Sequence, residues 1–277
     1  MKKKSSNFIL ILVFVIGLSL LLYPTVSDYW NSFHQTVAIA SYTDAVADIS
    51  DIQYKTMWEE AREYNEKLKE SGNRWILSEE DIEEYSKIMD VSGTGIMGYI
   101  EIPTIDCELP IYHGVDESVL QIAIGHIEGS SFPTGDPGTH AVLSGHRGLP
   151  SAKLFSDLDE LVEGDIFILQ MLDHTLTYEV DKISIVLPND LDDLEIEEGK
   201  DYCTLVTCTP YGVNSHRLLV RGHRIENMQG DSEVRVTADA MQIDPIIIAP
   251  IVAIPILLLL LIILLTSTSK RRRRGDA

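Results

Sequence analysis

Cys208 is the residue of this sequence that is best placed for covalent chemistry. It ends residues 202–208, whose threonine, valine and leucine content predicts a strand, and the turn-forming residues 209–212 follow at once. A strand fixes the position of the thiol, while its end leaves the thiol open to a substrate. Because cysteine attacks as a thiolate, it needs a base or a cation nearby. The sequence therefore predicts a nucleophile at Cys208, whereas Cys107 and Cys203 are expected to be small buried residues.

Several basic side chains could activate this thiol. His146 is one of them, because it follows closely on another predicted strand, residues 139–144. The other candidates are His216, His223, Arg217 and Arg221. Spacing alone does not choose among them. His140 and His146 could share a strand face and hold a metal, but thiolate or carboxylate ligands at suitable spacing are lacking, so no metal or other cofactor is expected.

Three short motifs, in a fixed order, resemble those of the sortase family. Residues 204–208 match the T-L-x-T-C signature, residues 144–147 are similar to the family's strand-end histidine motif, and Arg217 lies nine residues after Cys208. The resemblance extends from about residue 97 to residue 225. It implies that Cys208 is the nucleophile, that His146 is the general acid and base, and that Arg217 holds the oxyanion or substrate carbonyls.

The resemblance also implies a substrate and a reaction. The substrate would be an extended sorting signal of the L-P-x-T-G kind in a secreted protein, cleaved between threonine and glycine through a thioester on Cys208. Residues 98–103, 207–214 and 216–222, with the C-terminal apolar run, look most like the pilin-polymerising sortases, called class C. This likeness implies transfer to a lysine amine of a pilin on the surface of a Gram-positive-type cell.

Class C sortases generally carry a segment ahead of the barrel that folds over the active site as a lid, often anchored through an Asp-Pro-aromatic motif. This chain has no Asp-Pro pair ahead of residue 96. Asn73, Arg74 and Trp75 stand at about the position of that motif, so Trp75 is a candidate plug. Ordinary packing of an apolar side chain is the alternative interpretation of Trp75. The sequence does not show what would anchor such a lid.

The sequence is also compatible with three other functions. The chain could attach proteins to a cell-wall precursor, as housekeeping sortases do. It could be a membrane-tethered assembly or adhesion module that binds peptides without turnover, or a cysteine peptidase that uses water as the acceptor. These alternatives differ in the acceptor and in whether Cys208 is needed at all.

The elements that must position these residues are mainly short strands. Their number and spacing predict a closed antiparallel barrel or a sandwich, and the resemblance implies a sortase-type barrel of about eight strands with short helices. The strongest strand signals are residues 97–102, 139–144, 165–171, 175–186, 202–208 and 217–225. A polar helical segment precedes them, with an apolar stripe at Tyr54, Met57, Ala61, Tyr64 and Leu68. We expect this stripe to cover the chain's own barrel.

The two ends of the chain predict a membrane protein. Lys2 to Lys4 precede the apolar residues 8–23, and a second apolar run, residues 246–265, is followed by basic residues 270–274. An uncleaved N-terminal anchor is favoured over a signal peptide because no convincing cleavage site follows. The positive-inside rule places both termini in the cytoplasm and the domain between them outside the cell membrane.

The charge of the intervening region excludes nucleic acid as a partner. The chain carries a formal charge of −21, and eight of its 22 basic residues lie at the extreme ends. The region between these two basic clusters therefore contains 14 basic and 42 acidic residues. Such a surface repels phosphate. The expected organisation is a tail with an N-terminal transmembrane helix in residues 1–27, a helical segment in 28–95, and the barrel in 96–226. A linker in 227–244 and a second transmembrane helix with a basic tail in 245–277 complete it.

Overall fold

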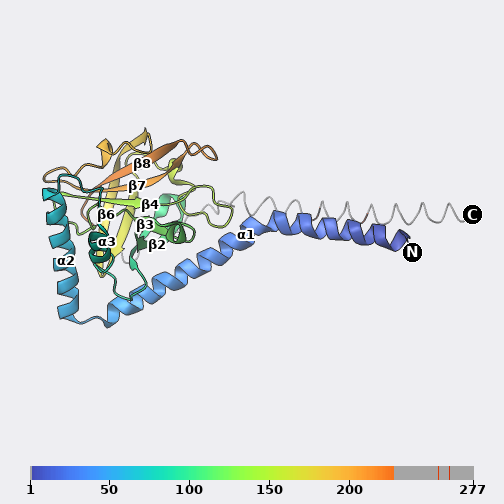
Figure 1. Ribbon diagram of the computed structural model, residues 1–277, viewed down its shortest axis with the longest axis horizontal. Helices are drawn as coiled ribbons and strands as arrows, with labels where there is room; N and C mark the ends of the chain where they lie inside the picture. The colour runs from blue at the N-terminus through green and yellow to red at the C-terminus, as the bar shows by residue number, and fades with distance from the viewer. Residues whose placement is uncertain (1, 228–254, 256–261, 263–277) are drawn as a thin grey trace, which may run out of the picture. The chain divides into compact units, whose positions relative to one another are not determined.

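A computed structural model describes residues 2–227, Pro255 and Ile262 (Figure 1). The described residues form four α-helices, three short 3₁₀ helices and eight strands. The helices are α1 (Lys2–Asp48), α2 (Asp51–Glu70), α3 (Glu79–Tyr85), α4 (Glu117–Leu120), η1 (Pro103–Ile105), η2 (Leu158–Glu160) and η3 (Asp192–Leu194). The strands are β1 (Ile96–Ile102), β2 (Cys107–His113), β3 (Ile124–His126), β4 (Thr139–Ser144), β5 (Ile166–Met171), β6 (His174–Val186), β7 (Asp201–Thr209) and β8 (His216–Arg224).

The eight strands close into a barrel in the order β1-β2-β3-β4-β7-β8-β6-β5. The predicted closed barrel is therefore confirmed, but the prediction that it is antiparallel throughout is wrong. Strand β2 is parallel to β3, and β4 is parallel to β7. Parallel neighbours need a crossover connection, supplied here by the loop that carries α4 and by the β5–β6 hairpin. Residue periodicity reports which face is buried and not the strand direction, so the sequence could not reveal these two pairs.

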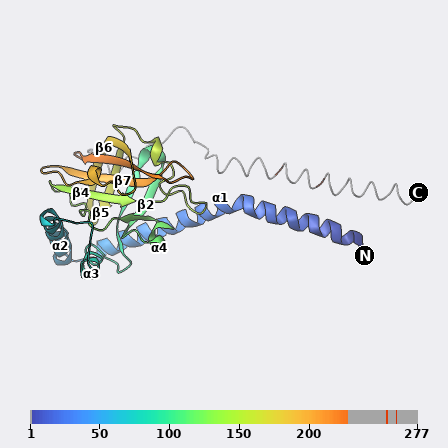
Figure 2. The same cartoon turned by 45° about the horizontal axis from the view of Figure 1, so that its top comes forward.

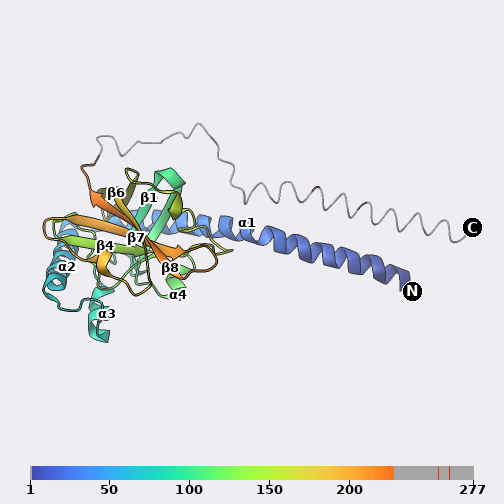
Figure 3. The same ribbon diagram turned by 90° about the horizontal axis from the view of Figure 1, so that it is seen from above.

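Strands β4, β7 and β8 form the wall that carries the candidate site (Figure 2 and Figure 3). Along β7, Cys203 and Leu205 point into the main core, so their neighbours Thr204 and Val206 point outward. Cys208 continues the outward series at the end of the strand. The alternation of side chains thus brings the predicted nucleophile to the outer face of the barrel.

Helix α2 packs on the barrel, as its apolar stripe predicts. It begins at a capping box formed by Ser50 and Gln53 and ends before Ser71. Trp58 and Ala61 are buried in the main core, which Tyr64 also contacts. The other stripe residues, Tyr54, Met57 and Leu68, are partly or fully buried. The sequence interpretation of α2 as a cover for its own domain is confirmed.

The long helix α1 belongs to two units, of which the first contains residues 1–30 and the second begins at Asn31. In the second unit, Tyr42 is buried and its hydroxyl donates to the carbonyl of Met97 and accepts from the amide of Leu172, at 2.9 and 2.7 Å. The part of α1 from Ile11 to Asp48 is, within the described residues, the one helix long and apolar enough to cross a membrane. The predicted second span, residues 246–265, lies outside the described residues except for Pro255 and Ile262.

Candidate active site

Cys208 and Arg217 lie opposite each other on the paired strands β7 and β8. Both residues are half-buried. The pair Val206 and Leu219, two residues along each strand, belongs to an outer apolar cluster, so Cys208 and Arg217 share its face of the barrel. The Arg217 guanidinium donates long hydrogen bonds of 3.4 and 3.2 Å to the carbonyls of residues 214 and 216. Because these hydrogen bonds are long and therefore weak, breaking them costs the guanidinium little free energy when it binds another acceptor.

His146 is fixed beside the end of β7 by backbone contacts of its neighbour Gly145. The Gly145 amide donates to the Val206 carbonyl at 3.0 Å, and the Thr207 hydroxyl donates to the Gly145 carbonyl at 2.8 Å. His146 follows Gly145, and Cys208 follows Thr207. The contacts between these two segments therefore bring His146 and Cys208 to the same end of the sheet. The site therefore unites all three residues that the sequence motifs indicate, although no hydrogen bond joins their side chains in the described part of the chain.

Gly145 leaves no room for a side chain. A Cβ at this position would lie 2.7 Å from the Phe155 ring and 2.8 Å from Ile124. The backbone amide of Phe155 also donates to the His146 carbonyl at 3.1 Å. The close packing of Gly145 and the hydrogen bond to the His146 carbonyl thus hold the backbone of His146 in place.

The loops that follow β4 and β7 contact each other near the site. A Cβ at Gly148 would meet the Tyr211 ring at 2.6 Å, and the Arg147 guanidinium lies 5.8 Å from the centre of the same ring. Arg147 also forms an ion pair of 2.5 Å with Asp159, and its side chain is only 11% exposed. Arg147 therefore serves as a structural link rather than as a free cation beside Cys208.

The other two cysteines are unsuitable as nucleophiles. Cys203 is fully buried in the main core, and burial raises the pKa of its thiol well above the usual range. Burial likewise raises the pKa of Cys107 to about 12. Both groups stay protonated at neutral pH, and a thiol is a poor nucleophile. All three cysteines are free of disulfides, and Cys208 is the one at an outward-facing strand end.

His140 is a structural residue. Its Nδ1 lies 2.8 Å from the Glu195 carbonyl and its Nε2 lies 2.7 Å from the Thr204 hydroxyl. Burial lowers the pKa of His140 to about 4, so the ring is neutral at physiological pH. Because protein groups engage both ring nitrogens, His140 has none to offer a metal shared with His146.

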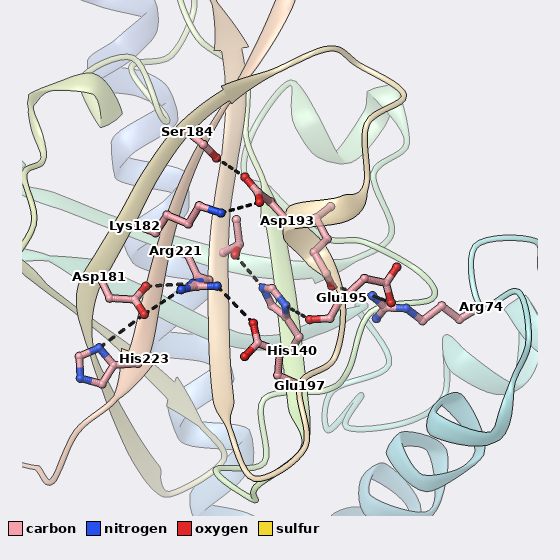
Figure 4. A network of polar contacts seen from close by, with 12 residues as sticks. Arg74, His140, Asp181, Lys182, Ser184, Asp193, Glu195, Glu197, Arg221 and His223 are labelled. Atoms are coloured by element: carbon pink, nitrogen blue, oxygen red, sulfur yellow. Dashed lines mark hydrogen bonds and ion pairs between the residues drawn. The ribbon is translucent and has the colours of Figure 1, made fainter.

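Arg221, one of the candidates to activate the thiol, instead forms a salt bridge with Asp181 (Figure 4). Its guanidinium makes two hydrogen bonds to the Asp181 carboxylate, at 2.9 and 3.0 Å, and stacks 4.1 Å from the Tyr202 ring centre. Its Nη1 lies 3.7 Å from Glu197. These contacts occupy the Arg221 guanidinium, so it is not a free cation for Cys208.

The outer apolar cluster forms a floor beside Cys208 and Arg217. Its buried members are Val142, Leu194, Val206 and Leu219, and the partly buried residues against it are Trp75, Ile127, Val186 and Leu191. Trp75 reaches this floor from the segment between α2 and α3. The predicted plug therefore packs against the apolar cluster on the outer face of the barrel, and two members of this cluster, Val206 and Leu219, lie two residues from Cys208 and Arg217.

Arg74 holds the Trp75 segment against the β6–β7 loop. Its side chain is only 7% exposed, and its Nη2 donates to the Leu194 carbonyl at 2.6 Å. The guanidinium lies 4.4 Å from the Trp75 ring centre and points at Glu195, whose carboxylate is 3.8 Å away (Figure 4). Gly129 receives this segment, because a Cβ there would lie 2.1 Å from the Arg74 carbonyl. Sequence reasoning missed this anchor, since no short motif links residue 74 to residue 194.

Glu117 is a second group that the sequence did not reveal. Its Oε2 lies 3.6 Å from the Nε2 of His146. The two residues are 29 positions apart and come together because β3 pairs with both β2 and β4. Without the parallel β2–β3 pair, no pattern in the sequence would place them side by side.

Comparison with known proteins matches residues 100–225 to the sortase domain. The crystal structure of sortase C1 from Streptococcus agalactiae is 54% identical, with a TM-score of 0.67, and the match covers 69% of this chain and 98% of that chain. Sortase C from Clostridium perfringens, solved with the C-terminal cell wall sorting motif, is 38% identical, with a TM-score of 0.62 and coverage of 69% and 100%. Sortase D of Bacillus subtilis is 34% identical over 131 residues, which are 46% of this chain and 63% of that protein. This chain therefore spans slightly less than two thirds of that curated relative.

Proposed function

Because the chain belongs to the sortase family of cysteine transpeptidases, we propose that it cleaves an L-P-x-T-G-like sorting signal and transfers it to a lysine amine of a pilin. The observation that carries this proposal is the meeting of His146, Cys208 and Arg217 at one end of the β4–β7–β8 wall. A half-buried thiol at a strand end, with a histidine and an arginine beside it, suits acyl transfer to an amine.

In the first half of the reaction, the Cys208 thiolate attacks the threonine carbonyl of the signal. The electron pair of the carbonyl moves onto oxygen, and the Arg217 guanidinium donates to this oxyanion. The carbon–nitrogen bond then breaks as the His146 imidazolium gives its proton to the departing glycine amine. The product is a thioester on Cys208 and a neutral imidazole. Arg217 acts as a donor and not as a base, since its guanidinium stays charged.

In the second half, a lysine amine attacks the thioester. His146 takes a proton from the incoming amine, and Cys208 leaves as a thiolate, which restores the starting state. The new bond is an isopeptide bond. The choice of a pilin lysine is supported by the likeness to sortases C, at 38 to 54% identity over nearly the whole length of those structures.

The Trp75 segment is proposed as a cover over the substrate groove. Trp75 packs on the apolar cluster that contains Val206 and Leu219, the direct neighbours of Cys208 and Arg217 on the outer face. An extended signal peptide needs that surface for its own apolar side chains. In place of the Asp-Pro pair, Arg74 supplies the anchor through the Leu194 carbonyl. Substrate entry therefore requires this segment to move away.

We also propose that the chain is anchored in the cell membrane, with the barrel outside and both termini in the cytoplasm. The apolar helix α1 supports the N-terminal anchor, and the basic residues at both ends support the orientation. A reporter enzyme that is active only in the cytoplasm, fused after residue 277, should be active. A silent reporter, with the fusion present at normal level, would contradict two-pass topology.

An acceptor competition tests the transfer step. The full-length protein in detergent is given a sorting-signal peptide together with a pilin lysine peptide and a cell-wall-type amine, and the products are weighed by mass spectrometry. The proposal predicts an isopeptide product on the lysine. Transfer exclusively to the wall-type amine would refute the pilin assignment, and release of acid alone would indicate a peptidase. Cys208→Ala serves as the matched control and should give no product with any acceptor.

A further inference from the structure

Glu117 lies beside His146, the proposed acid and base. Its Oε2 is 3.6 Å from His146 Nε2, and the side-chain amide of Gln121 donates to its other oxygen, Oε1. Glu117 begins α4, one turn ahead of Gln121, so the helix itself aligns the amide with the carboxylate. The carboxylate therefore has one oxygen held by its own helix and the other turned towards the imidazole.

The carboxylate is charged at neutral pH. The hydrogen bond from Gln121, followed by the proximity of His146, lowers the pKa of Glu117 below its usual range. A charged carboxylate attracts an N–H group of the neighbouring ring and stabilises an imidazolium. The distance of 3.6 Å is longer than a hydrogen bond, but contacts of catalytic histidines are often long in the ligand-free state and tighten when substrate is bound.

We infer that Glu117 is a positioning residue for His146, and this inference rests on the proposed transpeptidase function. Glu117 accepts from Nε2–H and so directs the opposite nitrogen, Nδ1, to the reacting groups. Nδ1 then carries the proton that passes to the leaving glycine amine and is regained from the incoming lysine amine. His146 is 28% exposed, so its ring would otherwise sample several orientations, and the contact narrows them.

Because the Glu117 side chain is 73% exposed, the effect is expected to be modest. Replacing Glu117 by glutamine should lower kcat for peptide transfer about two- to fivefold, the range of an exposed charge pair, with KM unchanged. Glu117→Asp should restore part of this loss, since it keeps the charge. Asp116→Asn is the matched control, because it removes one charge from the adjacent exposed position, whose side chain makes no capping hydrogen bond, while the ion pair with His146 is made by Glu117.

A second readout is independent of turnover. In full-length protein labelled with ¹⁵N-histidine in detergent, the Nε2 resonance of His146, identified by its loss in His146→Gln, should shift in Glu117→Gln and stay in place in Asp116→Asn. An unmoved resonance in Glu117→Gln, or a shifted resonance with unchanged kcat, would overturn the positioning role. If the wild type fails to transfer any peptide while the resonance still shifts, the contact exists but the proposed function fails, and the catalytic part of this inference fails with it.

Discussion

Replacing Arg74 by alanine is expected to expose the thiol of Cys208. In the wild type, the buried guanidinium donates to the Leu194 carbonyl at 2.6 Å and stacks on Trp75. A hydrogen bond from a charged donor contributes about 1.5–3 kcal/mol. The ion pair with Glu195 adds little, because the distance is 3.8 Å and the carboxylate is 66% exposed. Burial works against the anchor, since it lowers the pKa of Arg74 and leaves Nη1 without a partner.

Loss of about 1.5–3 kcal/mol from the closed form corresponds to a ten- to roughly hundredfold rise in the population of the open form. The rate at which a charged thiol reagent modifies Cys208 should rise by the same factor, provided that opening and closing are fast compared with modification. Mass spectrometry of the digested full-length protein locates the label. Trp75→Ala should behave similarly, because it removes the side chain that covers the floor.

Ile76→Ala is the matched control, since Ile76 is 76% exposed and adjoins the same segment. It should leave the rate of modification unchanged. If Arg74→Ala modifies at the wild-type rate while the protein remains folded, the Trp75 segment does not limit access to Cys208. The proposal that this segment covers the site would then be wrong.

Three further changes test other parts of the account. Gly145→Ala should destabilise the protein by about 1–3 kcal/mol and reduce activity, because the new methyl group collides with Phe155; an unchanged melting temperature would contradict the packing described. Asp181→Asn should also cost about 1–3 kcal/mol by weakening its bidentate contact with Arg221, yet leave kcat nearly intact; a large loss of kcat at wild-type stability would contradict the structural role of that pair. Burial raises the pKa of Asp201 to about 6. The folded state therefore binds its proton more tightly than the unfolded state does, and stability from this group falls by up to about 3 kcal/mol as pH rises from about 4 to 6. Asp201→Asn should remove this slope from urea unfolding curves, and an unchanged slope would exclude the assignment.

The shared face of Cys208 and Arg217 could be predicted from the sequence because strand alternation is a local property. Side chains two residues apart on a strand point to the same face of the sheet. Cys208 therefore lies on the face of Val206, and Arg217 on the face of Leu219. The apolar stripe of α2 was predictable for the same reason, since helical spacing alone defines it.

Contacts between distant segments could not be predicted. The parallel β2–β3 pair involves a strand of three residues, too short to show a periodic pattern, and it brings Glu117 to His146. Likewise, arginine is rarely buried, so composition gives no reason to expect that Arg74 is buried. Nor does it indicate a hydrogen bond to Leu194, 120 residues further along the chain. Both features depend on how loops pack on the barrel, and local propensity carries no information on that packing.

The most direct test of Cys208 as the acyl-transfer nucleophile is the mass of the full-length protein after incubation with a sorting-signal peptide. We expect an adduct equal to the acyl part of the peptide, joined to Cys208 as a thioester and released by an added lysine amine. Arg74→Ala should accumulate it faster, and Cys208→Ala should not form it. Absence of an adduct in both the wild type and Arg74→Ala, across a panel of L-P-x-T-G-like peptides, would contradict the assignment of Cys208 as the acyl-transfer nucleophile.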